Sequence, residues 1–235
     1  ELRDRAFETA GHSLEKWTML VTYTAVSARG AATCVAVTTA SLDRAARLGV
    51  LFSPENKDVC IFPSIFNSDG QPQFCCFHRP VPKSFGNPDI WFARSPDLVS
   101  WGQHKHIIGA ETKDLTRWDA GRVGGGAPSV RCEKGWLHIY HAADKQSRYC
   151  LGAFLSSTVD PSHIIARSKL PILSPDMPYE QQGFFPNVVF TCGVVVKKKA
   201  NEEELWVYYG AADDKVALAV FQLETIYNTL EPIAQ

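Results

Sequence analysis

The sequence has no long apolar run, no excess of one charge and little helical periodicity. No apolar run approaches the roughly 18–20 residues that a membrane-spanning helix needs, so no membrane partner is expected. The 24 basic residues are balanced by 25 acidic ones, giving a formal net charge of −1. Proteins that bind polyanions through charge have a basic excess, so nucleic acid is not an expected partner either. The first residues lack the apolar segment of a signal peptide. A cytoplasmic location is expected from the cysteine pattern, which fits a reducing compartment.

The chain also lacks any pattern of metal-ligating or disulfide-bonded cysteines. The cysteine count is odd, no C-x-x-C motif occurs, and each cysteine lies in or beside an apolar run. This pattern predicts buried, reduced thiols rather than zinc ligands or a disulfide framework. No compact cluster of His, Asp and Glu is present either, so we expect no metal and no cofactor. The cysteines are Cys34, Cys60, Cys75, Cys76, Cys132, Cys150 and Cys192.

Short runs rich in Val, Ile, Phe, Tyr and Trp recur between turn residues, which is typical of an all-β protein. The segment 223–230 is open to either of two interpretations, a last strand or a short helix. The predicted strands cover residues 17–23, 33–38, 59–62, 73–77, 89–93, 136–140, 149–155, 188–190, 205–209 and 216–223.

One strand type occurs four times, at spacings of roughly 55–70 residues. Each copy ends on a small or polar pair and is followed by a second strand. Four copies of a multi-strand unit predict stacked sheets of the kind found in β-propellers. A two-sheet β-sandwich is the alternative, although it does not explain the repeat. The four copies cover residues 20–25, 74–79, 137–142 and 205–210.

Two candidate cations lie at the ends of repeated strands, and two more lie before the predicted strand 59–62 and at the start of the glycine-rich segment 122–128. Positive side chains that converge repel one another unless an anion lies among them, and arginine offers paired N–H donors to a phosphate. We therefore expect a phosphate or sugar phosphate site, the alternative being four unrelated surface charges. The glycines after Arg122 are interpreted as a turn that lets the backbone approach a ligand. The candidate cations are Lys57, Arg79, Arg122 and His141.

Several motifs occur in an order that resembles glycoside hydrolase family 130, the β-mannoside phosphorylases and related β-mannosidases. The resemblance runs from about Trp17 to the C-terminus. The motifs include Asn56-Lys57-Asp58, His78-Arg79-Pro80, Tyr140-His141, Pro186-Asn187-Val188-Val189-Phe190 and Tyr208-Tyr209-Gly210-Ala211-Ala212-Asp213.

The resemblance implies a five-bladed β-propeller, of which this chain represents about four blades. Residues 1–235 are accordingly expected to form one propeller domain that lacks the N-terminal blade of the family. An oligomer of identical chains is an open expectation.

The resemblance further implies inverting phosphorolysis of β-mannosides, which yields α-D-mannose 1-phosphate and a shortened sugar. Inorganic phosphate is then the co-substrate, and a β-mannooligosaccharide or another mannosyl sugar is the substrate. By motif position, the phosphate-binding residues are Lys57, Arg79, Arg122, His141 and Tyr149. The substrate-binding residues are Asp58, His78, Phe190 and Asp213.

The general acid is the point where this sequence departs from the family. Members carry the acid in a Glu-Asp-Pro-Arg-like motif before the first matched strand, whereas this chain reads Glu1-Leu2-Arg3-Asp4-Arg5. Asp4 is the predicted acid, with Glu1 as the fallback.

Two other functions remain open at this stage. The first is an inverting β-mannosidase, which needs a second carboxylate as general base, with Glu180 and Asp213 as candidates. The second is a mannoside-binding propeller without catalysis. The sequence leaves the choice between β-1,2 and β-1,4 linkage open.

Overall fold

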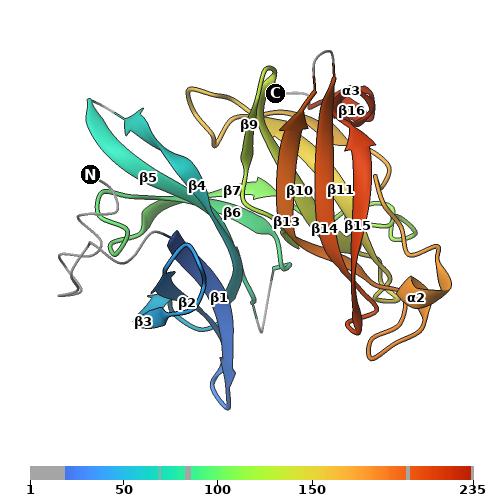
Figure 1. Cartoon of the computed structure of the whole chain (residues 1–235), viewed down its shortest axis with the longest axis horizontal. Helices are drawn as coiled ribbons and strands as arrows, with labels where there is room; N and C mark the ends of the chain where they lie inside the picture. The colour runs from blue at the N-terminus through green and yellow to red at the C-terminus, as the bar shows by residue number, and fades with distance from the viewer. Residues whose placement is uncertain (1–18, 69, 83–85, 200–201, 234–235) are drawn as a thin grey trace.

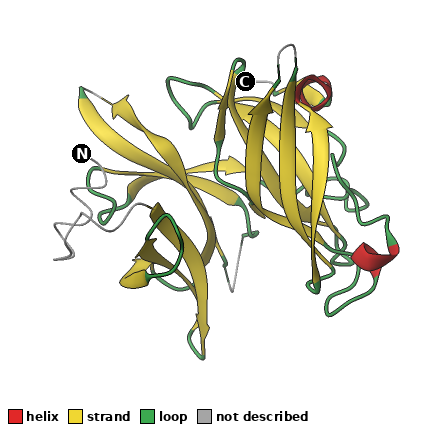
Figure 2. Cartoon of the chain, in the orientation of Figure 1, coloured by secondary structure: helices red, strands yellow, loops and turns green. Residues whose placement is uncertain are grey.

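The structure is a computed structural model that describes residues 19–68, 70–82, 86–199 and 202–233. Strands dominate these residues, and the helices are short (Figure 2). The strands form four sheets, and neighbouring strands within each sheet are antiparallel (Figure 1). The predicted all-β class is confirmed. Within the described ranges, no helix is long and apolar enough to cross a membrane.

The first sheet is a meander of β1 (Met19–Ser27), β2 (Gly30–Thr38) and β3 (Ala45–Phe52). The central strand β2 is mostly buried, whereas β1 is exposed along much of its length. Among the described residues, no strand pairs with the outer edge of β1.

The second sheet contains β4 (Asn56–Ser68), β5 (Gln71–Pro80), β6 (Ile90–Ser95) and β7 (Gly102–Ile108). Its strands follow one another in chain order. Consecutive antiparallel strands need only short connections, so the sequence order becomes the spatial order.

The third sheet has the order β16-β12-β11-β10-β8, with β9 also paired to β10. The C-terminal strand joins this sheet at the far edge of β12, so the end of the described chain returns to an earlier sheet. The members are β8 (Arg122–Gly125), β9 (Val130–Cys132), β10 (Gly135–Ala143), β11 (Tyr149–Ser156), β12 (Ile164–Ser168) and β16 (Leu230–Pro232).

The fourth sheet consists of β13 (Val189–Lys198), β14 (Glu203–Ala211) and β15 (Lys215–Gln222). Two short helices accompany it, α2 (Pro178–Gln181) and α3 (Leu223–Asn228). The open choice for segment 223–230 is thereby resolved as a helix, which leads into β16.

Three apolar cores lie between successive sheets. Phe52 and Cys76 belong to the core between the first and second sheets. Phe77 and Tyr140 belong to the core between the second and third sheets, and Leu137 to the core between the third and fourth. All nine residues of β10 are buried, since its alternate side chains enter the two cores on either side of the third sheet.

The predicted repeat corresponds to the four sheets. The repeated strand is β1, β5, β10 and β14, and the strand that follows it is β2, β6, β11 and β15. The second, third and fourth sheets each have a further strand on the other side of the repeated one, namely β4, β8 and β13. Four sheets with a core between each successive pair argue against the two-sheet sandwich.

Two sequence interpretations need correction. The segment at Arg122 was expected to be a glycine-rich turn, but Arg122–Gly125 forms strand β8, paired with β10. The seven cysteines are free thiols, and six of them are buried as predicted, whereas Cys192 is exposed. Cys192 lies at a register shift of β13, where the side-chain alternation is broken.

His138 in β10 is a buried histidine that the core holds in its neutral form. Its two ring nitrogens are hydrogen-bonded to the hydroxyls of Ser129 and Ser156, at 2.7 and 2.8 Å. The ring stacks on Phe154 at 4.4 Å between centroids. Burial lowers the pKa of His138 to about 3, so the imidazole of His138 stays neutral in the folded protein in mild acid.

This burial predicts an acid-sensitive contribution to stability. Below its ordinary pKa of about 6.5, His138 is protonated only in the unfolded chain, so stability falls as the pH drops from 6.5 towards 3. Between pH 7.5 and 5, the loss from this residue is about 2 kcal/mol. His138→Gln should remove that part of the pH dependence, measured by denaturant unfolding at both pH values. An equal pH dependence in the variant and the parent would contradict the assignment.

Candidate active site

Strand ends from the second, third and fourth sheets meet at one place in the molecule. Lys57 is the second residue of β4 and Arg79 the last but one of β5, whereas β8 and β11 begin there with Arg122 and Tyr149. The register aligns Lys57 with Arg79 across β4 and β5. In Figure 1 these strand ends lie in the lower middle of the view. The antiparallel order therefore brings residues that are distant in sequence to one edge.

The carboxylate of Asp58 lies at the centre of this cluster. Its Oδ2 atom is 2.7 Å from Nε of Arg79 and 3.3 Å from Nε2 of His141, and its Oδ1 atom is 3.8 Å from Nζ of Lys57. The side chains of Asp58, Arg79 and His141 are at most 6% exposed, whereas that of Lys57 is 34% exposed. Asp58 thus links three basic side chains in a buried environment.

The charges of this group follow from burial and from its partners. Burial raises the pKa of Asp58, but His141, Arg79 and Lys57 outweigh that effect and hold the pKa below its ordinary value. Burial lowers the pKa of His141, and the nearby Asp58 offsets this only in part. Near pH 7 we therefore assign an ionised Asp58 beside a neutral His141.

Gly124 allows Asp58 and His141 to come this close to β8. A Cβ atom at Gly124 would lie 2.4 Å from Oδ2 of Asp58 and 2.5 Å from Nε2 of His141. Gly124 also pairs with His141 across β8 and β10. The glycine is therefore needed for close packing inside the cluster, and a turn does not account for it.

Arg122 and two aromatic rings extend the cluster towards the fourth sheet. Nη1 of Arg122 donates to the Tyr149 hydroxyl at 3.0 Å, and its guanidinium lies over the Tyr149 ring. The ring of His141 is 6.0 Å from that of Tyr149 and 4.1 Å from that of Phe190. The five predicted phosphate-binding residues, together with Asp58 and Phe190, therefore belong to one connected group.

Several buried polar atoms of this group have no hydrogen-bond partner. They are Oδ2 of Asp58, Nε and Nη1 of Arg79, and both ring nitrogens of His141. Arg79 and Asp58 are close enough to attract each other, but they are not aligned for a hydrogen bond. Nε of Arg79 and Nε2 of His141 face the Asp58 carboxylate, whereas Nη1 of Arg79 has no partner. Buried polar groups are nearly always hydrogen-bonded, so a buried donor without a partner in a positively charged group is typical of an anion-binding site.

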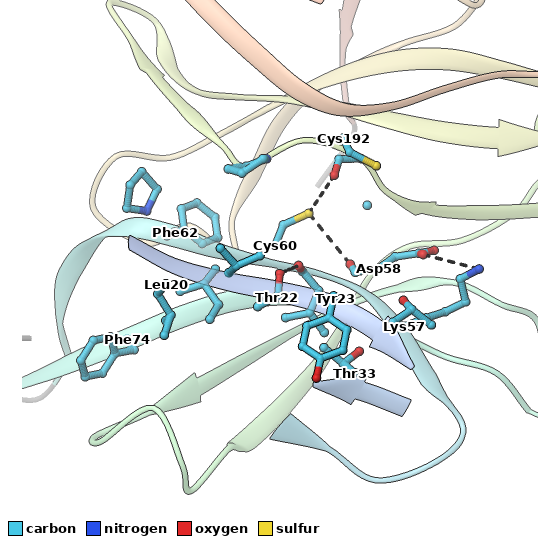
Figure 3. Close-up of a pocket in the computed structure, with 18 of the residues that line it drawn as sticks. Leu20, Thr22, Tyr23, Thr33, Lys57, Asp58, Cys60, Phe62, Phe74 and Cys192 are labelled. Carbon is cyan, nitrogen blue, oxygen red and sulfur yellow. Dashed lines mark hydrogen bonds and ion pairs between the residues drawn. The ribbon is translucent and has the colours of Figure 1, made fainter. Parts of the chain in front are cut away.

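A cavity of about 790 Å³ opens from this cluster between β1 and β4. Lys57 and Asp58 lie at one end of it, and Phe62 and Phe74 lie at the other (Figure 3). Phe190 also borders the cavity. One end therefore offers charge and the other apolar surface, an arrangement that suits an anion next to a sugar.

The structure does not bring His78 into the cluster. Neighbouring residues of a strand point to opposite faces, so His78 faces away from the site while Arg79 faces into it. His78 is hydrogen-bonded to Asn56 at 2.9 Å and to His104 at 3.0 Å, and it stacks on Phe52. Burial lowers its pKa to about 3. The hydrogen bond from His78 fixes Asn56, which is the residue before Lys57. Direct contact between His78 and the sugar stays a prediction.

Of the other carboxylates that the sequence offered as catalytic or sugar-binding groups, the structure describes Glu180 and Asp213. Glu180 is buried, since Oε1 accepts from the Tyr209 hydroxyl at 2.6 Å and Oε2 accepts from the backbone N–H groups of Asp176 and Met177. Asp213 is exposed in the turn after β14, and its sugar contact stays a prediction. The predicted acid Asp4 and the fallback Glu1 lie outside the described residues.

Comparison with known proteins gives a consistent result. The family described as beta-1,4-mannooligosaccharide phosphorylase, glycoside hydrolase family 130, matches residues 15–232. A beta-1,2-mannobiose phosphorylase of Listeria innocua is 42% identical over 211 residues, which are 90% of this chain and 56% of the relative. A 1,2-beta-oligomannan phosphorylase of Thermoanaerobacter is 40% identical over 77% of this chain and 55% of the relative.

The solved structures agree with the sequence comparison. The Listeria innocua enzyme in complex with beta-1,2-mannobiose superposes with a TM-score of 0.81 at 39% identity, over 91% of this chain and 58% of that one. The chain thus spans somewhat more than half the length of the relatives it matches. Because the family model and these relatives match most of the chain, the chain belongs to glycoside hydrolase family 130.

Proposed function

We propose that the protein catalyses inverting phosphorolysis of β-mannosides to α-D-mannose 1-phosphate and a shortened sugar. The observation that carries this proposal is the buried cluster at Asp58, where Lys57, Arg79 and Arg122 supply three positive charges against one carboxylate. The unpaired Nη1 donor of Arg79 supports an anion beside this carboxylate. The names of the relatives, which are phosphorylases, point the same way.

In this proposal the cluster binds and orients inorganic phosphate. Phosphate is already anionic near pH 7, so its oxygen can attack the anomeric carbon without a general base. Arg79 offers two fixed N–H donors, and Lys57 and Arg122 offset the remaining charge. Phosphate that is held in line with the scissile bond reacts within one bound complex, which lowers the entropic part of the activation barrier.

The glycosidic C–O bond breaks as the phosphate oxygen bonds to the anomeric carbon, and the leaving oxygen takes a proton. Asp4 is the proposed source of that proton, acting on the face of the sugar opposite phosphate. Phe190, Asp58 and Asp213 are the proposed contacts to the mannose. Inorganic phosphate is the co-substrate in this proposal.

Hydrolysis is the second candidate, and the position of Glu180 disfavours it. An inverting hydrolase needs a carboxylate that activates water. Both oxygens of Glu180 are engaged by Tyr209 and by two backbone N–H groups, and the side chain is buried. Asp213 remains as a candidate base, but the cationic cluster has no role in hydrolysis.

We also propose that the four sheets are blades of a five-bladed propeller within a single domain. Support comes from the order of the sheets along the chain and the core between each successive pair. The superposition on the Listeria innocua enzyme over 91% of this chain supports it further.

The first substrate to test is β-1,2-mannobiose, since the more similar relatives are named for β-1,2-linked substrates. A Ruminococcus albus relative named for β-1,4-mannooligosaccharides is 29% identical. Incubation with the disaccharide should release mannose 1-phosphate only when phosphate is present. Equal release of free mannose without phosphate would identify a hydrolase, and binding without any product would identify a sugar-binding protein.

Arg79→Lys tests the phosphate site while it keeps the charge. Lysine cannot reproduce the paired donors of arginine, so the KM for phosphate should rise about 10-fold or more. Arg94→Lys is the matched control, because Arg94 lies in the same sheet and pairs with Asp160 at 2.9 Å. Initial rates at varied phosphate give both constants. An unchanged phosphate KM in Arg79→Lys would argue against the proposed site.

Gly124→Ala tests whether β8 must pack this closely against the cluster. The added methyl group would displace Asp58 or His141 from their contact, so the phosphate KM should rise about 10-fold. The melting temperature should fall as well, because His141 lies in a close-packed, fully buried strand. Gly102→Ala is the control, since no atom lies within 4 Å of the position of its Cβ. Phosphate kinetics and thermal unfolding of both variants separate the two effects. The same kinetics in both variants would contradict the proposed role of Gly124.

A further inference from the structure

Asp58 is an acidic side chain at the centre of a site that is proposed to bind an anion. The side chain is 5% exposed, and it borders the cavity beside Lys57 (Figure 3). A fixed negative charge repels an entering anion and offsets part of the positive charge of its neighbours. The attraction between Asp58 and the basic side chains explains how the group stays together, but it involves the two carboxylate oxygens unequally.

The two oxygens of Asp58 have different partners. Oδ2 faces Nε of Arg79 at 2.7 Å and Nε2 of His141 at 3.3 Å. Oδ1 forms an ion pair with Nζ of Lys57 at 3.8 Å, which is too long for a hydrogen bond (Figure 3). A carboxylate has about four acceptor positions, two on each oxygen. Oδ1 can therefore accept a hydrogen bond from a ligand in the cavity.

His141 adds a second acceptor to the same group. A carboxylate only accepts hydrogen bonds, so the Asp58 oxygen that faces Nε2 favours the neutral tautomer with its proton on Nε2. Nδ1 then has a lone pair, and it is buried without a hydrogen-bond partner. Nη1 of Arg79 is a buried donor without a partner. The group thus combines open donors with open acceptors, and a ligand that suits both kinds carries ionised oxygens and a hydroxyl.

Tetrahedral oxyanions differ in whether they carry such a hydroxyl. Near pH 7, phosphate and arsenate keep at least one proton, whereas sulfate is fully ionised. A sulfate oxygen that faces Asp58 would place two acceptors and two negative charges together without a proton between them. Sites that hydrogen-bond a ligand hydroxyl reject analogues that lack it, because a buried polar group is then left unpaired.

We propose that Asp58 selects a protonated oxyanion by accepting, at Oδ1, a hydrogen bond from the hydroxyl of the bound phosphate. The proposal rests on the proposed function, and it adds discrimination against sulfate as a property of the phosphate site. An ionised phosphate oxygen attacks the anomeric carbon, and the proton that faces Asp58 stays on the phosphate in the product. Asp58 is therefore a positioning residue for phosphate. Oδ1 has a second acceptor position for the proposed mannose contact.

Anion binding by the parent protein tests this selection directly. Isothermal titration calorimetry without sugar, at fixed ionic strength, should show that phosphate and arsenate bind at least about 30-fold more tightly than sulfate and fluorophosphate. Fluorophosphate is the sharpest comparison, since it is a doubly charged phosphate analogue in which fluorine replaces the hydroxyl. A smaller difference between phosphate and fluorophosphate would overturn the proposal.

Asp58→Asn tests whether this residue makes the selection. Asparagine tolerates the left-handed backbone of Asp58, at φ 56°, and its amide can donate to any oxyanion. The ratio of the sulfate to the phosphate dissociation constant should therefore fall about 10-fold or more. An unchanged ratio in a folded Asp58→Asn variant would overturn the proposal. If thermal unfolding shows that this variant is not folded, the fluorophosphate comparison in the parent decides.

Asp119→Asn is the matched control. Asp119 is 1% exposed and lies 2.9 Å from Nε of Arg117 and 3.1 Å from Nη2 of Arg167, so it is also a buried carboxylate between basic groups. It is not among the described residues that line the cavity. Asp119→Asn should keep the sulfate to phosphate ratio of the parent.

Inhibition kinetics separate this proposal from the proposed function. If the parent binds phosphate selectively but forms no mannose 1-phosphate, the proposed function fails and the selection by Asp58 stands. If phosphorolysis occurs, and sulfate competes with phosphate at an inhibition constant close to the phosphate KM, the proposed function stands and the selection is overturned.

Discussion

The attraction between the Asp58 carboxylate and its basic neighbours is the interaction on which the candidate site depends. Lys57 and Arg79 would repel each other across β4 and β5 without a negative charge between them. One buried carboxylate lets these side chains stay close, yet the group stays positive, and Arg122 adds to its charge. An anion that enters therefore finds donors already in place, and little reorganisation is needed.

The packing of the sheets determines whether this arrangement can form. Lys57, Asp58 and Arg79 come from the second sheet, His141 and Arg122 from the third, and Phe190 from the fourth. Their relative positions are set by the cores between those sheets, and β10 contributes side chains to two of them. Because β10 is buried on both faces, a shift of His141 would have to move both cores, which is costly in a close-packed interior.

Much of the fold could be predicted because strand signals are local. Each of the ten predicted strand segments overlaps a strand of the structure where it describes them, and the repeat matches the four sheets. β3 and β7 were not predicted, because these strands have few buried apolar residues and form outer edges of their sheets. β8 was misread because glycines usually mark turns, whereas here they let a strand approach Asp58 and His141.

The candidate site could be predicted only in part, since residue type does not specify which face of a strand a side chain takes. His78 and Arg79 are adjacent in one motif, yet the pleat of β5 directs Arg79 into the cluster and His78 towards His104 and Asn56. Motifs can therefore identify which residues form the charged centre of such a site, whereas the face that each side chain takes depends on the pleat of its strand and on how the sheets pack against each other.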